Sequence, residues 1–291
     1  MLTRLALGLL LITLLVSPIR AQTTAPVRDP QALTAIASSL KALTGGTTVN
    51  DVILQATANY VAGSDEETGT ATLTASGNQQ SLVKLYLSNG SREEIRNGPG
   101  GAWIGPDGTA HSMFANNCWT DASWFFPVLT LEAVSANAQV SVSNLGPDTS
   151  KGATLLHLRV ASAPSGEDAT TTALITTLST MDIYLDPQSF LPLVLDFNVQ
   201  PDTGISVNVP VEIRFGNFQN LSGALVPFEI QKYLQGSLLL DFKVANVTVN
   251  SGVPSSVFAL PAVASVANIR RASKRPSSAF TPSRVNTGGG Q

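Results

Sequence analysis

Two segments in the C-terminal half of the chain decide its fold class: residues 209–215 read VPVEIRF and residues 238–244 read LLLDFKV. In both segments apolar residues recur at every second position, and most of the residues between them are polar or charged. This alternation places one set of side chains on a core and the other in water, as in strands of an antiparallel sheet. The two segments therefore predict a mainly β protein.

Further short segments on either side of these two also have the character of strands. Asn89-Gly90, which lies between two such segments, is a strong signal for a hairpin turn. Additional strands are predicted over residues 52–61, 70–75, 81–87, 93–96, 102–104, 181–185, 193–199 and 226–234. We expect them to form an antiparallel sheet in which many neighbours are consecutive in the chain.

Helical patterns occur at three places among the predicted strands. Asp29-Pro30 combines an N-cap residue with a proline at the first helical position. The apolar residues that follow at helical spacing, before Gly45-Gly46, are Leu33, Ile36, Leu40 and Leu43. Residues 116–133 and 167–180 interrupt the strands and contain further helical patterns. We expect these inserted helices to cover the concave face of the sheet as lids.

The composition allows a real core and excludes several classes of protein. Of 291 residues, 43% are hydrophobic and 13% are charged, which rules out a disordered chain. The single cysteine, Cys118, excludes a disulfide framework and a multi-cysteine zinc module. The core of the protein must therefore be apolar packing.

The two ends of the chain differ from its body. Arg4, an uncharged run over residues 5–16, a Ser17-Pro18 break and Ala21 have the layout of a secretory signal peptide over residues 1–21. The uncharged run is shorter than the ~20 residues that a membrane-spanning helix needs. We expect cleavage after Ala21 and export to the periplasm or the medium.

Residues 267–291 hold five basic residues and no acid, whereas residues 22–266 hold ten basic and twenty acidic residues, a formal charge of −10. The basic tail has little apolar material, so it is predicted to be disordered. It is either a solvated terminus or an electrostatic contact with an anionic envelope surface. Export and the acidic body argue against nucleic acid as a partner.

The sequence offers little for catalysis. His111 and His157 lie on separate segments, and Cys118 is accompanied by no acid with a recognisable role. Two histidines and one thiol are too few for a zinc site with three or four ligands. Glu93-Glu94 and the acidic run at residues 65–67 lie next to turn signals and are interpreted as solvated charge. We predict no catalytic residues, no metal and no cofactor, and hence not an enzyme.

The order of motifs after residue 182 resembles that of a known family. The motifs are DIYLDP at 182–187, LPL at 191–193, VEIRF at 211–215, GALVPFEI at 223–230 and VNSGVPSSVF at 249–258. They are similar to those of the exported outer-membrane lipoprotein carrier superfamily, which includes the LolA, LolB and RseB/MucB types. The resemblance covers about residues 31–261 and is firm after residue 182.

The resemblance implies a LolA-like half-barrel over residues 22–266: a strongly curved, incomplete antiparallel barrel whose hollow is covered by helices. It implies a non-catalytic protein of the cell envelope that carries a lipid, a lipoprotein acyl chain or another hydrophobic ligand in that hollow. The alternative is an envelope sensor of the RseB type that docks a partner protein. The oligomeric state stays open.

The residues expected to contact the ligand are aromatic or aliphatic, and most lie in the inserted segment 116–133; they are Trp103, Trp119, Trp124, Phe125, Phe126 and Leu129. A small barrel can hold one apolar ligand, and each buried methylene contributes ~0.8 kcal/mol. Aromatic rows are also common in cores. The sequence leaves both interpretations open: the aromatic segment either fills the barrel or gates it.

Overall fold

The computed structural model describes residues 26–201, 204–221 and 223–262. The predicted signal peptide with its cleavage point and the predicted basic tail lie outside these residues. The helices are α1 (Pro30–Thr44), α2 (Pro127–Ala136) and α3 (Ala169–Leu178), with short 3₁₀ turns η1 (Ala115–Cys118) and η2 (Ser255–Phe258).

The strands of the first half are β1 (Asp51–Ala62), β2 (Asp65–Ser76), β3 (Gln80–Leu87), β4 (Gly90–Asn97), β5 (Gly100–Ile104) and β6 (Ala110–Met113). Those of the second half are β7 (Val140–Asp148), β8 (Leu155–Ser162), β9 (Met181–Leu185), β10 (Pro192–Val199), β11 (Val209–Leu221), β12 (Ala224–Leu234) and β13 (Ser237–Val249). The predicted strands are confirmed, although β2 begins five residues earlier than predicted and β11 and β13 end six and five residues later; β6, β7 and β8 are additional.

The described strands form one antiparallel sheet of thirteen strands in the order β6-β5-β4-β3-β2-β1-β13-β12-β11-β10-β9-β8-β7. The chain runs outward from β1 to the edge strand β6, crosses through α2 to the other edge, and returns strand by strand to β13 beside β1. In that central pairing Val52 lies opposite Val249 and Ala58 opposite Phe242. The first and last strands therefore join the two halves of the sheet.

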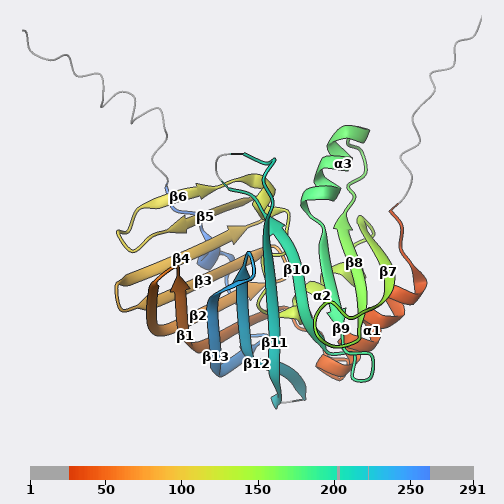
Figure 1. The fold of residues 1–291 in the computed structure, drawn as a ribbon, viewed down its shortest axis with the longest axis horizontal. Coiled ribbons are helices and arrows are strands. Elements are labelled where there is room, and N and C mark those ends of the chain that lie inside the picture. Colours follow the sequence, from red (N-terminus) through yellow and green to blue (C-terminus); the bar gives the residue numbers. More distant parts are fainter. Residues whose placement is uncertain (1–25, 202–203, 222, 263–291) are drawn as a thin grey trace, which may run out of the picture.

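The sheet is strongly curved, as its shared core shows. Val83 and Leu85 on β3 belong to the same buried cluster as Leu158 and Val160 on β8, although seven strands separate β3 from β8. A flat sheet of thirteen strands would be roughly 60 Å wide, since strands lie about 4.8 Å apart. One core can include both strands only if the sheet curls, and Figure 1 shows it curving around α2. The mainly β, half-barrel fold is confirmed.

Two helices lie on the concave face. Asp29 caps α1 by accepting hydrogen bonds from the backbone N–H groups of Gln31 and Ala32, and Gly45 ends the helix at φ 60°. Ile36 and Leu43 of α1 are fully buried in the shared core, and α1 packs against α2 and the strands β7 and β12. The prediction of this first helix is confirmed.

The third helix does not act as a lid. α3 confirms the helical pattern at residues 167–180, and Asp168 caps it, but Leu178 is its only buried residue. Leu174 is 41% exposed, and Figure 1 shows α3 projecting beyond the end of β8. The expectation that this segment covers the concave face is therefore wrong, because its alanine and threonine residues offer too little apolar surface for a helix to pack on the sheet.

Replacing Phe125 with Ala is expected to lower the free energy of unfolding by about 3–5 kcal/mol, because Phe125 is 0% exposed in the shared core. The matched control is Leu174→Ala on the exposed face of α3, which should change it by less than about 0.5 kcal/mol. Chemical unfolding followed by circular dichroism measures both. Equal stability of Phe125→Ala and wild type would contradict the packing of this segment.

Candidate functional site

A cavity of about 380 Å³ lies on the concave side of the sheet, between β1, β3, β4, β5, β12 and β13 and the segment that precedes α2. We call it the inner cavity. Its apolar wall includes Tyr60, Leu85, Trp103, Trp124 and Leu240. Its rim is formed by the turn at Gly105-Pro106 and by Leu239 near the start of β13.

Strand register brings charged side chains to this face. In the β3–β4 hairpin Val83 lies opposite Glu94, Leu85 opposite Arg92 and Ser81 opposite Arg96. Directly paired residues of an antiparallel sheet project to the same side. Since Val83 and Leu85 are core residues, the three charged residues of β4 project inward as well.

The structure corrects the interpretation of Glu93-Glu94 as solvated charge. Glu93 forms an ion pair with Lys84 at 2.6 Å, and its side chain is 21% exposed. Glu94 on the same strand is 26% exposed, and both glutamates line the inner cavity. Successive residues of a strand point to opposite faces, so the two glutamates have different partners, and neither is fully solvated.

The acidic run at residues 65–67 needs the same correction. Glu67 is 3% exposed, and Arg92 clamps it with two hydrogen bonds of 2.5 and 3.2 Å. The Asn89 backbone N–H donates a third hydrogen bond to it, and the Arg92 guanidinium stacks 4.6 Å from the Tyr60 ring centroid. The hydrogen bonds from Arg92 lower the pKa of Glu67 despite some loss of solvation.

A second charged group, which we call the floor of the inner cavity, consists of Glu94 and Lys232 in the cavity wall and of Arg96, which pairs with Glu94 but does not line the cavity. Arg96 Nε lies 3.1 Å from Glu94 Oε1, and Lys232 Nζ lies 4.0 Å from Glu94 Oε2. The same ammonium lies 4.4 Å from the centroid of the Trp124 ring, in cation–π contact. Arg96 is 3% exposed and also donates to Thr120 Oγ1 at 3.1 Å.

Burial and neighbouring charges shift the pKa values of these groups in opposite directions. Burial acts to raise the pKa of Glu94, but the positive charges of Lys232 and Arg96 outweigh it and lower that pKa. Burial lowers the pKa of Lys232, against the attraction of Glu94. The nearby Asp121 carboxyl has its pKa raised by burial, although Ser123 donates hydrogen bonds to it. The inner cavity thus has an apolar wall and a charged floor, at which the two cations Arg96 and Lys232 share the Glu94 carboxylate.

The six predicted site residues do not share one surface. Trp103, which is 38% exposed, and Trp124, which is 1% exposed, line the inner cavity together. Trp119 lines a separate cavity of about 270 Å³. The remaining three, Phe125, Phe126 and Leu129, are fully buried in the shared core.

The charged residues Glu67, Arg92, Glu94, Arg96 and Lys232 were missed by the sequence analysis. A signal for most of them was present: Arg92, Glu94 and Arg96 are spaced by two, and the Asn89-Gly90 turn aligns them with the alternating apolar residues of the preceding strand. Lys232 follows Ile230 on one face of β12 in the same way.

The two histidines and the cysteine are used structurally. The His111 ring stacks on Trp103 with centroids 4.0 Å apart. The Cys118 thiol donates to the Phe114 carbonyl oxygen at 3.7 Å, and burial raises its pKa, which disfavours the reactive thiolate. Their contacts indicate packing rather than a nucleophile and a base.

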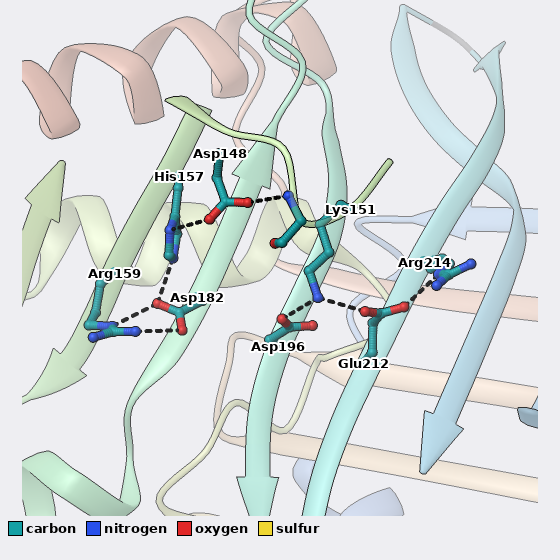
Figure 2. Close-up of polar contacts among 9 residues, drawn as sticks. Asp148, Lys151, His157, Arg159, Asp182, Asp196, Glu212 and Arg214 are labelled. Atoms are coloured by element: carbon teal, nitrogen blue, oxygen red, sulfur yellow. Dashed lines mark hydrogen bonds and ion pairs between the residues drawn. The ribbon is translucent and has the colours of Figure 1, made fainter. Parts of the chain in front are cut away.

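His157 belongs to a polar network on the other face of the sheet, shown in Figure 2. Its Nε2 lies 2.9 Å from Asp182 Oδ1, its Nδ1 lies 3.6 Å from Asp148 Oδ2, and its ring stacks on Tyr184. Arg159 also clamps Asp182 with bonds of 2.8 and 2.9 Å. Burial acts to raise the pKa of Asp182, but the hydrogen bonds from Arg159 and the contact with His157 outweigh it and lower that pKa.

Lys151 links the β7–β8 loop to this network. Its Nζ lies 2.5 Å from Asp196 and 2.6 Å from Glu212, and Glu212 also pairs with Arg214 at 2.5 Å (Figure 2). These residues line an outer groove of about 560 Å³. Because its charged walls already pair with one another, the network ties the loop to β10 and β11. Within the described ranges, no group of three or more His, Cys, Asp or Glu is placed to hold a metal ion.

Comparison with solved structures found similar chains, some of them in the group that the sequence resembles. A LolA superfamily protein from Nitrosomonas europaea is 13% identical, with 78% of this chain and 97% of that chain covered and a TM-score of 0.47. A DUF1329 family protein from Desulfovibrio piger is 11% identical, with 81% and 98% covered and a TM-score of 0.47. MucB in the MucA/MucB complex of Pseudomonas aeruginosa is 12% identical, with 81% and 64% covered and a TM-score of 0.25.

No protein-family model and no curated protein matches the chain. Identities and TM-scores this low say nothing about what the chain binds, so the site has to be interpreted from its own geometry. Among the described residues, no helix has the length and apolarity required to cross a membrane.

Replacing Arg92 with Met is expected to move acid unfolding to higher pH. The lowered pKa of Glu67 contributes stability that is present above its ordinary pKa near 4.5 and is lost as the pH falls through the lower folded value. Without Arg92 the buried carboxyl takes up its proton at higher pH. Circular dichroism between neutral and acid pH measures the midpoint.

The control for this titration is Lys41→Met in the last turn of α1, where the exposed lysine forms no ion pair with a described residue. Its midpoint should match wild type. An unchanged midpoint for Arg92→Met would show that Glu67 does not depend on the clamp.

Proposed function

We propose that the protein is an exported, non-catalytic binding protein that holds one apolar ligand, such as the acyl chain of a lipid or lipidated protein, in the inner cavity. The observation that carries the proposal is the inner cavity itself, which Trp103, Trp124, Leu85 and Leu240 line on the concave face. Its 380 Å³ volume lies within the ~300–1,000 Å³ of typical small-molecule sites.

The filled core limits how the ligand lies. Phe125, Phe126 and Leu129 occupy the centre of the concave side, so an acyl chain would not run the length of the sheet. It would enter at the rim beside Gly105-Pro106 and end near Trp124. At ~0.8 kcal/mol for each buried methylene, even part of a chain gains enough to bind.

Trp103→Ala tests this function. Trp103 is the partly exposed aromatic in the wall of the inner cavity, so its loss should weaken the binding of the fluorescent fatty acid cis-parinaric acid by about tenfold, through lost apolar contact. Phe114→Ala is the control, because Phe114 is 45% exposed and lies outside the cavity wall. No binding by wild type, or equal affinity of Trp103→Ala and wild type, would refute the proposal.

A second candidate function, docking of a partner protein, is favoured by the edge strand β6. Among the described strands it pairs only with β5, and Phe114 next to it is exposed. The other edge is partly covered, because Arg28 bridges to Val142 of β7. An open edge can accept an extended peptide as an added strand.

Native mass spectrometry of protein purified from its own envelope fraction separates the two functions. Carriage of a ligand predicts copurified lipid with a mass that varies by acyl length. Docking predicts a second polypeptide in stoichiometric amount. Detection of the protein alone, with neither lipid nor a second polypeptide, after non-denaturing purification would count against both functions.

A further inference from the structure

The floor of the inner cavity has more positive than negative charge. Arg92 and Glu67 neutralise each other through their two hydrogen bonds. Of the other charged residues that line the cavity, Glu93 pairs with Lys84, and Glu94 lies near Lys232 and also pairs with Arg96, which is outside the lining. Asp121 does not line the cavity, and burial raises its pKa against the opposing charge of Arg96. The cavity therefore has room for one more negative charge at its floor.

Lys232 is the residue of the floor at which an additional negative charge would bind. It lies in the wall of the cavity, and its side chain is 12% exposed. Its ammonium lies 4.4 Å from the centroid of the Trp124 ring and 4.0 Å from Glu94 Oε2, which is too far for a hydrogen bond. An ammonium has three N–H donors, and hydrogen bonds from it to a charged acceptor are stronger than those to a neutral acceptor.

We infer that Lys232 binds the ionised carboxylate of a free fatty acid whose chain lies in the inner cavity; this inference rests on the proposed function. The geometry and charge agree on this class of ligand. A carboxylate supplies one negative charge and two acceptor oxygens, which completes the hydrogen bonding of Lys232. With it, two cations and two carboxylates balance on the floor of the cavity.

Other acyl head groups fit less well. An ester or an alcohol leaves the excess positive charge uncompensated. A phosphate monoester carries nearly two negative charges at neutral pH and would leave an excess of negative charge beside Glu94. The free acid is therefore the expected ligand, and the three other head groups are comparison arms of the test.

The experiment measures binding of cis-parinaric acid and of its methyl ester to the full chain. Wild type should bind the acid roughly ten- to a hundredfold more tightly than the ester, the range for a hydrogen bond to a charged group. Lys232→Met should lose most of this preference while keeping its affinity for the ester. Lys41→Met, at an exposed lysine in the last turn of α1 and outside the cavity lining, should behave as wild type.

A second variant acts in the opposite direction. Glu94→Gln removes the carboxylate that competes for the two cations, so it should tighten binding of the acid and leave the ester unchanged. Displacement of the fluorescent acid from wild type by dodecanoate, dodecanol and dodecyl phosphate needs no variant and still ranks the head groups if a substitution prevents folding.

The outcomes distinguish this inference from the proposed function. If neither the acid nor the ester binds, the proposed function fails and the inference fails with it. If both bind equally to wild type, or if dodecyl phosphate displaces the probe better than dodecanoate, the cavity still binds acyl chains and the carboxylate assignment alone is overturned. A Lys232→Met variant that keeps the full preference for the acid would also overturn it.

Discussion

The rest of the structure depends on burying the apolar face of a sheet that is too wide to be flat. Thirteen strands present one continuous apolar face, from Val83 on β3 to Leu158 on β8, and water cannot be excluded from it by two short helices unless the sheet curls around them. The segment from Trp124 to Leu129 supplies the bulk around which it curls, with each of its aromatic side chains at most 1% exposed. Curvature, the concave face and the inner cavity all follow from this packing.

This packing places the residues of the aromatic segment in two different environments. Phe125, Phe126 and Leu129 fill the interior, while Trp124, one residue earlier, has its ring against Lys232 and in the wall of the inner cavity. A segment can therefore fill most of a half-barrel and still shape the hollow that remains. What is left is the inner cavity beside Trp124 and a separate cavity beside Trp119, rather than one trough along the concave face.

Much of the fold could be predicted from the sequence, because alternation, Asn-Gly turns and the Asp29-Pro30 cap are local signals. β7 was harder to find, because its sequence VSVSNLGPD carries few large apolar residues, a glycine and a proline, and it forms through pairing with β8. The charged floor of the inner cavity was missed for a different reason. Charge next to a turn normally means solvent, and only the register that sets Glu94 opposite Val83 shows that this side chain points inward.

Charged side chains that face an apolar cavity are costly to desolvate, and packing alone does not explain why they are there. Replacing a buried ionic group by apolar residues is often neutral or stabilising, so stability alone does not explain the presence of Glu94, Arg96 and Lys232. On the outer face the opposite holds: Lys151 is directly bonded to both Asp196 and Glu212, and the groups there compensate one another. The ammonium of Lys232 lacks such partners. The Lys232 ammonium lies beside the Trp124 ring and near the Glu94 carboxylate without a hydrogen bond to it, so it can bind an acceptor on a ligand. The inferred free fatty acid supplies an apolar chain for the cavity and a negative charge for this ammonium.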